Sequence, residues 1–158
     1  PDQMDRCAGM QVRVDAQSTF LLRKAGAVAG FLGKDVADRA FPMRSMIDRM
    51  GMDLLGQGTD NPINDLDPFL NMGFMVTRRD INGTVYGAGE AITREEAVRL
   101  YTSAAARYAF REDDLGTIEP GKLADLAVLS DHIFDVPETE VSTIRAVRTI
   151  VNGQVVTP

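Results

Sequence analysis

Residues 54–65 read LLGQGTDNPIND, a short apolar run that ends in a glycine-spaced turn. The apolar run has the composition of a buried strand, and its two glycines allow the backbone to turn tightly just beyond it. Pro62 fixes the direction in which the chain leaves the turn and keeps Asn61 out of the helical region. We therefore predict that Asp60 points its carboxylate outward from the end of a strand.

The segments before this turn alternate between strand and helix patterns. Residues 10–17, MQVRVDAQ, alternate valine with polar residues as a strand does, and residues 52–58 form the next short apolar strand. Between the two strands, residues 34–51 carry apolar side chains at helical spacing, with a break expected at Pro42. Residues 18–33 are rich in Gly and Ala, and we expect a loop there.

Two helix starts follow the turn. Asp67 and Pro68 have the residue types of an N-cap and of the first helical position. Residues 93–96, TREE, form a capping box in front of an apolar face about three turns long. The glycine-rich residues 78–92 between these helices are predicted to form a loop.

The chain changes character near residues 111–118. Beyond them, residues 119–122, EPGK, place Pro and Gly as a type II turn requires, and residues 123–130 have a strand pattern. Asn152-Gly153 lies between two β-branched runs, which is the strongest short-range signal for a hairpin. The sequence thus predicts a small β unit at the C-terminal end.

Composition excludes several classes of protein. The chain has 158 residues, of which 44% are hydrophobic, so it is long enough for one domain with a real core. The net charge is -6 and no basic stripe is interleaved with aromatics, so we expect no nucleic-acid partner. The longest apolar stretch, residues 25–33, is too short to span a membrane. Cys7 is the only cysteine, which excludes an intrachain disulfide.

Alternation of strand and helix implies parallel strands joined by crossovers, and such sheets gather function at the carboxyl ends of their strands. Gln17 and Asp60 follow the ends of the two predicted strands, so we expect both at one edge. An Asx turn, in which the Asp60 side chain bonds the local backbone, is the alternative reading. The GQG spacing does not fit a phosphate loop, because its third glycine would fall at Asn61. His132 is the only histidine and cannot form a zinc site by itself.

Three blocks of the sequence resemble the C-terminal part of the amidohydrolase superfamily. They are GTDNPINDLDP (58–68), VTRRDINGTVYGAGEAITREEAVRLYTSAAARY (76–108) and the stretch from DDLGTIEPGKLADLAVL (113–129) to the NGQVV of residues 152–156. The resemblance is closest to the amidohydrolase family 3 (YtcJ-like) branch, which includes N-substituted formamide deformylase, and it covers nearly the whole chain.

The resemblance implies an α/β fold that is part of a (β/α)8 TIM barrel with a small β-sandwich domain. By this resemblance, residues 1–114 are a partial barrel segment with strands 7 and 8 and their helices. Residues 115–158 are then the C-terminal share of the sandwich. A complete barrel needs about 200 to 250 residues or more, so this chain is expected to be a C-terminal fragment; it also begins at Pro1 with no signal-like segment after it.

Members of the family bind one or two divalent metals, usually zinc, and an Asp after strand 8 is one ligand. That position matches Asp60, and the resemblance implies that Asp60 binds the metal and carries a proton between the metal-bound water and the leaving nitrogen. Zinc lowers the pKa of its bound water toward 7, which suits hydrolysis of C–N bonds in small molecules. The family's histidine ligands do not match this chain, so we expect the isolated fragment to bind no metal and to be inactive.

Two alternatives stay open. Instead of being a fragment of an amidohydrolase, the chain would be a free-standing α/β module that binds a small ligand or a partner, or a small subunit that completes a barrel with another chain. Two barrel strands cannot close, so we expect association with the rest of the barrel or with a second copy. Gln17, Asn61 and Arg78 are predicted near the substrate. We expect no membrane segment, and the sequence assigns no compartment, so the cytoplasm is only the default.

Overall fold

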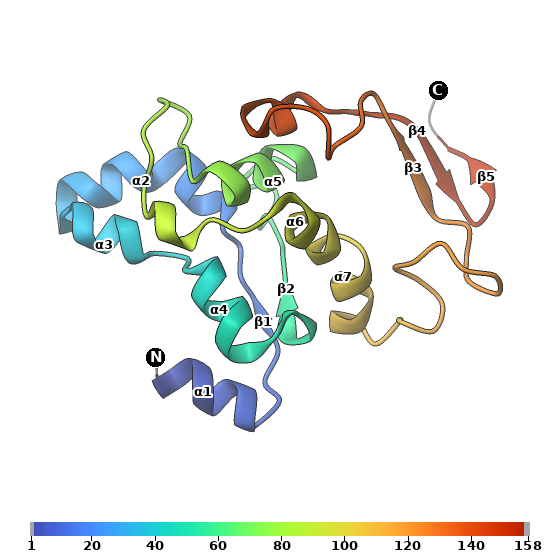
Figure 1. The fold of residues 1–158 in the computed structure, drawn as a ribbon, viewed down its shortest axis with the longest axis horizontal. Helices are drawn as coiled ribbons and strands as arrows, with labels where there is room; N and C mark the ends of the chain where they lie inside the picture. The colour runs from blue at the N-terminus through green and yellow to red at the C-terminus, as the bar shows by residue number, and fades with distance from the viewer. Residues whose placement is uncertain (1, 157–158) are drawn as a thin grey trace.

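The computed structural model describes residues 2–156, with a two-stranded parallel sheet at its centre (Figure 1). Strand β1 (Val14–Asp15) pairs with β2 (Leu55–Gly56), with Val14 opposite Leu55 and Asp15 opposite Gly56. The predicted parallel pairing is confirmed. Both strands are shorter than predicted, because only these backbone positions find a partner, and residues 52–54 form the 3₁₀ helix η1 (Met52–Leu54) instead.

The helices before β2 differ from the prediction at one place. They are α1 (Asp2–Gly9), α2 (Thr19–Leu32), α3 (Lys34–Arg39) and α4 (Met43–Met50). The break at Pro42 is confirmed, but the predicted loop over residues 18–33 is wrong, since most of it is the 14-residue helix α2. Leu21 and Ala25 of α2 are buried in a core cluster with Phe74. This tertiary packing outweighs the helix cost of the glycines.

Four helical segments follow β2: α5 (Pro68–Thr77), η2 (Ala88–Glu90), α6 (Arg94–Leu100) and α7 (Ser103–Tyr108). Asp67 caps α5 as predicted, and its carboxylate accepts the Phe69 N–H at 2.8 Å. The single helix predicted after residue 93 is instead two helices, broken at Thr102. The Thr102 hydroxyl donates to the Val98 carbonyl at 2.9 Å, a local bond that competes with continuation of the helix.

The capping box at the start of α6 is present with both of its hydrogen bonds. The Thr93 hydroxyl accepts the Glu96 N–H at 3.2 Å, and the Glu96 carboxylate accepts the Thr93 N–H at 2.9 Å. The same carboxylate pairs with Arg44 of α4 at 2.6 Å, so this helix start is tied to a second helix. Hydrogen bonds from Arg44 and Thr93 lower the pKa of Glu96, although burial alone would raise that pKa.

Thr93→Ala is therefore expected to lower the free energy of unfolding by about 1 kcal/mol, because it removes one N-cap bond from α6. Thr93→Ser keeps the hydroxyl and should stay within about 0.5 kcal/mol of the wild type. Urea unfolding followed by circular dichroism measures both differences. Equal losses in the two variants would show that the hydroxyl bond is not what stabilises the helix start.

The C-terminal region forms an antiparallel sheet of order β3–β4–β5. Its elements are β3 (Leu126–Leu129), the 3₁₀ segment η3 (Glu138–Thr143), β4 (Ala146–Val151) and β5 (Gln154–Val155). The predicted hairpin turn is confirmed, since Asn152 and Gly153 both have positive φ, at 51° and 77°.

The main hydrophobic core joins the C-terminal region to the helices. Ile133, Val141 and Ile144 are buried in the same cluster as Phe69 and Met72 of α5. Segment η3 lies directly against α5, where a Cβ on Gly73 would be 2.9 Å from the Ser142 side chain. The core therefore continues across the boundary predicted near residue 114. Within residues 2–156, no helix is long and apolar enough to cross a membrane.

Candidate functional site

The two parallel strands end at the same edge of the sheet, and two of the predicted site residues follow these strand ends. Gln17 follows β1 and Asp60 follows β2. Beyond the last paired residues, the Ala16 N–H donates to the Gly56 carbonyl at 2.9 Å and joins the two strand ends. Gln17 and Asp60 both adopt positive φ, at 32° and 55°. This conformation is uncommon for residues other than glycine and clusters at functional turns.

Asp15 connects the two strand ends, a role that no motif in the sequence predicts. The Asp15 carboxylate accepts the Gly58 N–H at 2.7 Å and the Gln17 side-chain amide at 3.1 Å. Contacts within the chain leave no space for a side chain at the two glycines before Asp60. A Cβ on Gly58 would lie 2.7 Å from the Asp15 carboxylate, and a Cβ on Gly56 would lie 2.9 Å from the Tyr108 ring. Close packing within the chain thus explains the glycine spacing.

Asp60 is exposed, and within residues 2–156 its carboxylate has neither a hydrogen bond nor an ion pair. Its backbone carbonyl accepts the Ile63 N–H at 2.8 Å, which closes the turn. The Asx-turn alternative requires a bond from this side chain to the local backbone, and the structure places none there. The carboxylate is therefore free to bind a group supplied from outside the described residues.

The turn around Asp60 is held by two asparagines. The Asn64 side chain is buried and donates to the Thr59 carbonyl at 2.8 Å, while Asn61 donates to the Asn64 carbonyl at 3.3 Å. These bonds fix the backbone on both sides of Asp60. Asn61 itself is exposed and follows Asp60 in the chain.

Buried side-chain hydrogen bonds connect the residue after Gln17 to helix α5 and to the C-terminal end of helix α6. The Ser18 hydroxyl donates to Asn71 of α5 at 3.0 Å, and the Asn71 amide donates to the Tyr101 hydroxyl at 2.7 Å. Ser18 and Asn71 are fully buried. Burial raises the pKa of Tyr101 to about 12, and the negative charges of Asp15 and Asp67 add to this rise. The phenol therefore stays protonated at neutral pH.

Arg78 lies elsewhere, at the C-terminal end of α5. Its side chain is fully buried, and its guanidinium donates to the carbonyls of Ala40, Phe41 and Tyr86, each at 2.9 Å. Burial lowers the pKa of Arg78, but a guanidinium remains charged in proteins. The α-helix rises about 1.5 Å per residue, so the length of α5 separates Arg78 from the strand-end edge. The structure gives Arg78 an architectural role, and proximity to a substrate stays only a sequence prediction.

The described residues do not by themselves fit a metal ion. In the range 2–156, no group of three or more His, Cys, Asp or Glu side chains is arranged to hold one. His132 lies in the C-terminal region, beside Asp135 at 3.2 Å. Zinc sites in proteins use three protein ligands or more. Asp60 could supply one of them, and the others would have to come from outside these residues.

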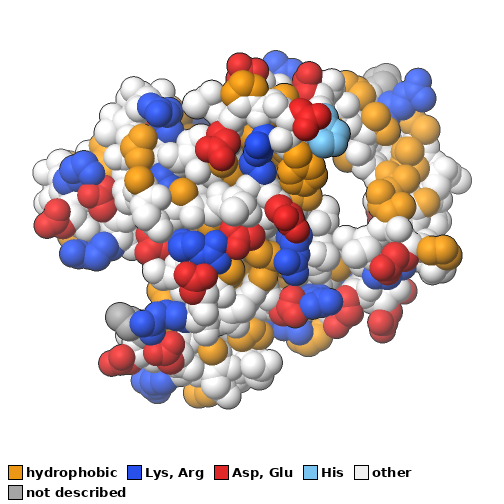
Figure 2. Space-filling view, viewed as in Figure 1, with side chains coloured by type: hydrophobic (Ala, Val, Ile, Leu, Met, Phe, Trp, Pro, Cys, Tyr) orange, Lys and Arg blue, Asp and Glu red, His pale blue; other side chains and the backbone are white. Residues whose placement is uncertain are grey.

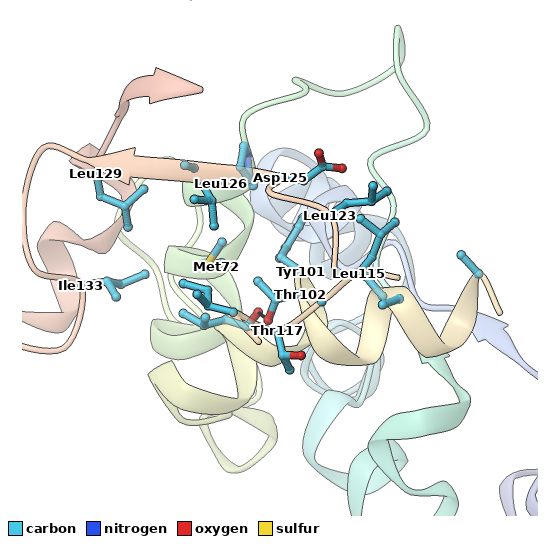
Figure 3. Close-up of a pocket in the computed structure, with 18 of the residues that line it drawn as sticks. Met72, Tyr101, Thr102, Leu115, Thr117, Leu123, Asp125, Leu126, Leu129 and Ile133 are labelled. Atoms are coloured by element: carbon cyan, nitrogen blue, oxygen red, sulfur yellow. Dashed lines mark hydrogen bonds between the residues drawn. The ribbon is translucent and has the colours of Figure 1, made fainter. Parts of the chain in front are cut away.

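An apolar hollow of about 590 Å³ lies between the helices and the C-terminal sheet (Figure 3). Met72 and Tyr101 line its helical side, and Leu126, Leu129 and Ile133 line the side of the sheet. Among the described residues that line it, Asp125 is the only charged one. The hollow is therefore distinct in chemistry from the polar edge at Asp60.

The sequence matches a family model described as "Amidohydrolase family" over residues 1–157. The chain is 32% identical over 156 residues to YtcJ of Bacillus subtilis (strain 168), which is named as an amidohydrolase. It is 34% identical over 115 residues to N-substituted formamide deformylase of Arthrobacter pascens. These alignments cover 97% and 73% of this chain but 29% and 21% of the relatives. The chain thus spans less than a third of their length.

Solved structures give the same picture. A metal-dependent hydrolase from Pyrococcus furiosus superposes on this chain with a TM-score of 0.61 at 32% identity. The superposition covers 77% of this chain and 24% of that protein. An amidohydrolase from Thermotoga maritima superposes with a TM-score of 0.65 over 99% of this chain and 34% of the Thermotoga protein. At 18% identity, this likeness shows the fold alone. The predicted fold class, an α/β part of a hydrolase barrel, is confirmed.

Proposed function

The chain belongs to the amidohydrolase family, and from this premise we propose that it is the C-terminal part of a metal-dependent hydrolase that cleaves amide-type C–N bonds in small molecules. The observation that carries the proposal is the free, exposed carboxylate of Asp60 just beyond strand β2. Functional residues of such barrels lie at the carboxyl ends of the strands. The named relatives and neighbours include a formamide deformylase and metal-dependent hydrolases, which supports hydrolysis of this bond type.

Asp60 is the residue that we assign to the chemistry. A divalent metal, zinc by preference, would supply a water of lowered pKa when it is bound. Asp60 would be the one ligand that this chain contributes, and its carboxylate would hold a proton during cleavage and return it to the leaving nitrogen. Gln17 follows β1 and Asn61 follows Asp60 in the chain, and we propose that their amides contact the substrate.

We further propose that β1 and β2 are strands 7 and 8 of the barrel and that residues 115–158 belong to its small β-sandwich domain. The outer edges of β1 and β2 have no strand beside them among the described residues. Val128, Val147, Val151 and Val155 of the C-terminal sheet are 46–60% exposed, and Figure 2 shows hydrophobic side chains gathered over this sheet beside an opening. Surfaces of this kind require cover from the remainder of the protein.

The proposal predicts that the 158-residue chain, supplied with Zn²⁺, releases no formate from N-substituted formamides. A longer protein that contains this chain is expected to hydrolyse such a substrate to formate and the amine, as measured by formate release. We also expect the isolated chain to associate in solution, which light scattering measures. Turnover by the isolated chain would refute its dependence on the rest of the barrel, and a longer protein that cleaves no amide would refute the assigned reaction.

A further inference from the structure

A side-chain bond continues the parallel sheet beyond its last backbone pair. The Ala16 N–H donates to the Gly56 carbonyl at 2.9 Å, where the ladder ends. Two residues later, the Gly58 N–H donates to Oδ1 of Asp15 at 2.7 Å rather than to a backbone carbonyl. The Asp15 carboxylate thus takes the place of the next backbone pair, and it fixes the path of the chain that leads to Asp60.

The closeness of this contact accounts for the glycine at position 58. A Cβ on Gly58 would lie 2.7 Å from Oδ2 and 3.1 Å from Oδ1 of Asp15, and the atoms nearest to it all belong to that carboxylate. Gly58 has no positive φ, so its backbone conformation is open to any residue. Contact with Asp15 is therefore what excludes a side chain at this position.

Gln17, two residues after Asp15 at the end of β1, also holds the Asp15 carboxylate. Its side-chain amide donates to Oδ2 of Asp15 at 3.1 Å, so each carboxylate oxygen accepts one hydrogen bond. Hydrogen bonds to an ionised carboxylate are stronger than those between neutral groups. Asp15 therefore joins Gln17 of one strand end to Gly58 of the other in a single arrangement.

We propose that Asp15 is a positioning residue, which holds the turn of Asp60 at the place that catalysis requires. The inference rests on the proposed function, since it gives Asp15 a role only if Asp60 takes part in hydrolysis. Asp15 need not touch the substrate, because it acts through the Gly58 amide two residues before Asp60. A displacement of about 1 Å at a reacting group can lower the rate about 100-fold.

In the intact hydrolase, Asp15→Ala is expected to lower kcat roughly 30- to 100-fold, with KM within about threefold of the wild type. Asp15→Asn keeps an oxygen that accepts the Gly58 N–H, and it should restore kcat to within about fivefold of the wild type. The exposed Asp113 makes no hydrogen bond among the described residues, and Asp113→Ala is the matched control. A kcat within about twofold of the wild type in Asp15→Ala, or no rescue by Asn, would overturn the proposal.

A double-variant cycle separates positioning from general destabilisation. Gly58→Ala should lower kcat about as much as Asp15→Ala, because the new Cβ displaces the carboxylate. In the double variant the carboxylate is gone and the methyl group has room, so kcat should fall no further than in either single variant. Losses that multiply would mean that the two positions act independently, and the proposal would fail.

The bond itself can be tested without any activity. In the 158-residue chain, the Gly58 amide should exchange its hydrogen at least about tenfold faster in Asp15→Ala than in the wild type, as measured by NMR. An unchanged exchange rate would overturn the positioning role directly. If this rate rises while the longer wild-type protein hydrolyses no amide, the contact stands and it is the proposed function that fails.

Discussion

Asp60→Asn in the intact hydrolase is expected to lower kcat by roughly 1,000-fold, while the thermal midpoint stays within about 1 °C of the wild type. The loss follows from removing the carboxylate that we assign as metal ligand and proton carrier. The stability should not change, because the Asp60 side chain is exposed and without a partner among the described residues. Asn is the suitable replacement, since Asn tolerates the positive φ of 55° at this position.

Asp65→Asn is the matched control for Asp60→Asn. Asp65 lies in the same turn region, is exposed and forms a surface ion pair with Arg23. Such pairs contribute little to stability, so we expect kcat within about twofold of the wild type. Metal content measured by atomic absorption should fall in Asp60→Asn and not in Asp65→Asn. If Asp60→Asn retained full turnover and full metal content, the assignment of Asp60 would be abandoned.

Arg78→Met is expected to lower the free energy of unfolding by about 3–5 kcal/mol. The Arg78 guanidinium donates to the backbone carbonyls of Ala40, Phe41 and Tyr86. The variant removes all three hydrogen bonds, and the Phe41 carbonyl keeps only the Met43 N–H as a donor. Arg78 therefore holds together the end of α5, the link between α3 and α4, and the loop before η2. Urea unfolding of the 158-residue chain measures the loss.

Arg79→Met is the control for Arg78→Met, because Arg79 is exposed and donates one hydrogen bond to the Gly83 carbonyl at 2.6 Å. Its loss should stay within about 0.5 kcal/mol. Arg78→Lys keeps the charge but cannot reproduce the planar fork, so we expect it to recover less than half of the stability lost in Arg78→Met. Equal losses in Arg78→Met and Arg79→Met would contradict the architectural role of Arg78.

Features set by a few neighbouring residues were predictable from the sequence. The cap at Asp67, the capping box at Thr93, the break at Pro42 and the hairpin turn at Asn152 all depend on residue types within one turn of chain. Each is present in the structure. The parallel pairing of the two strands followed from their alternation with helices, because a crossover connection leaves few other arrangements.

The sequence alone also placed Asp60 beyond a strand end, and the family resemblance gave this carboxylate a chemical role. Helix α2 was missed because its glycines and alanines lack a strong local signal. Its stability comes from Leu21 and Ala25, which pack against Phe74 of α5. Arg78 was predicted near a substrate, and nothing in the local sequence indicates that its guanidinium donates to three carbonyls, two of them from the distant residues Ala40 and Phe41.

The sequence by itself determined the local elements, the α/β class and the position of Asp60, since these depend on residue type, spacing and connectivity. Only the tertiary structure decided which polar groups support the turn. Asp15 and Gly58 are 43 positions apart in the chain, and the parallel register alone brings the carboxylate to the amide. The sequence explained the two glycines by a tight turn, whereas in the structure a Cβ on Gly58 or Gly56 would collide with Asp15 or Tyr108. The physical reason is that contact partners far apart in sequence are chosen by packing, which no short stretch of residues encodes.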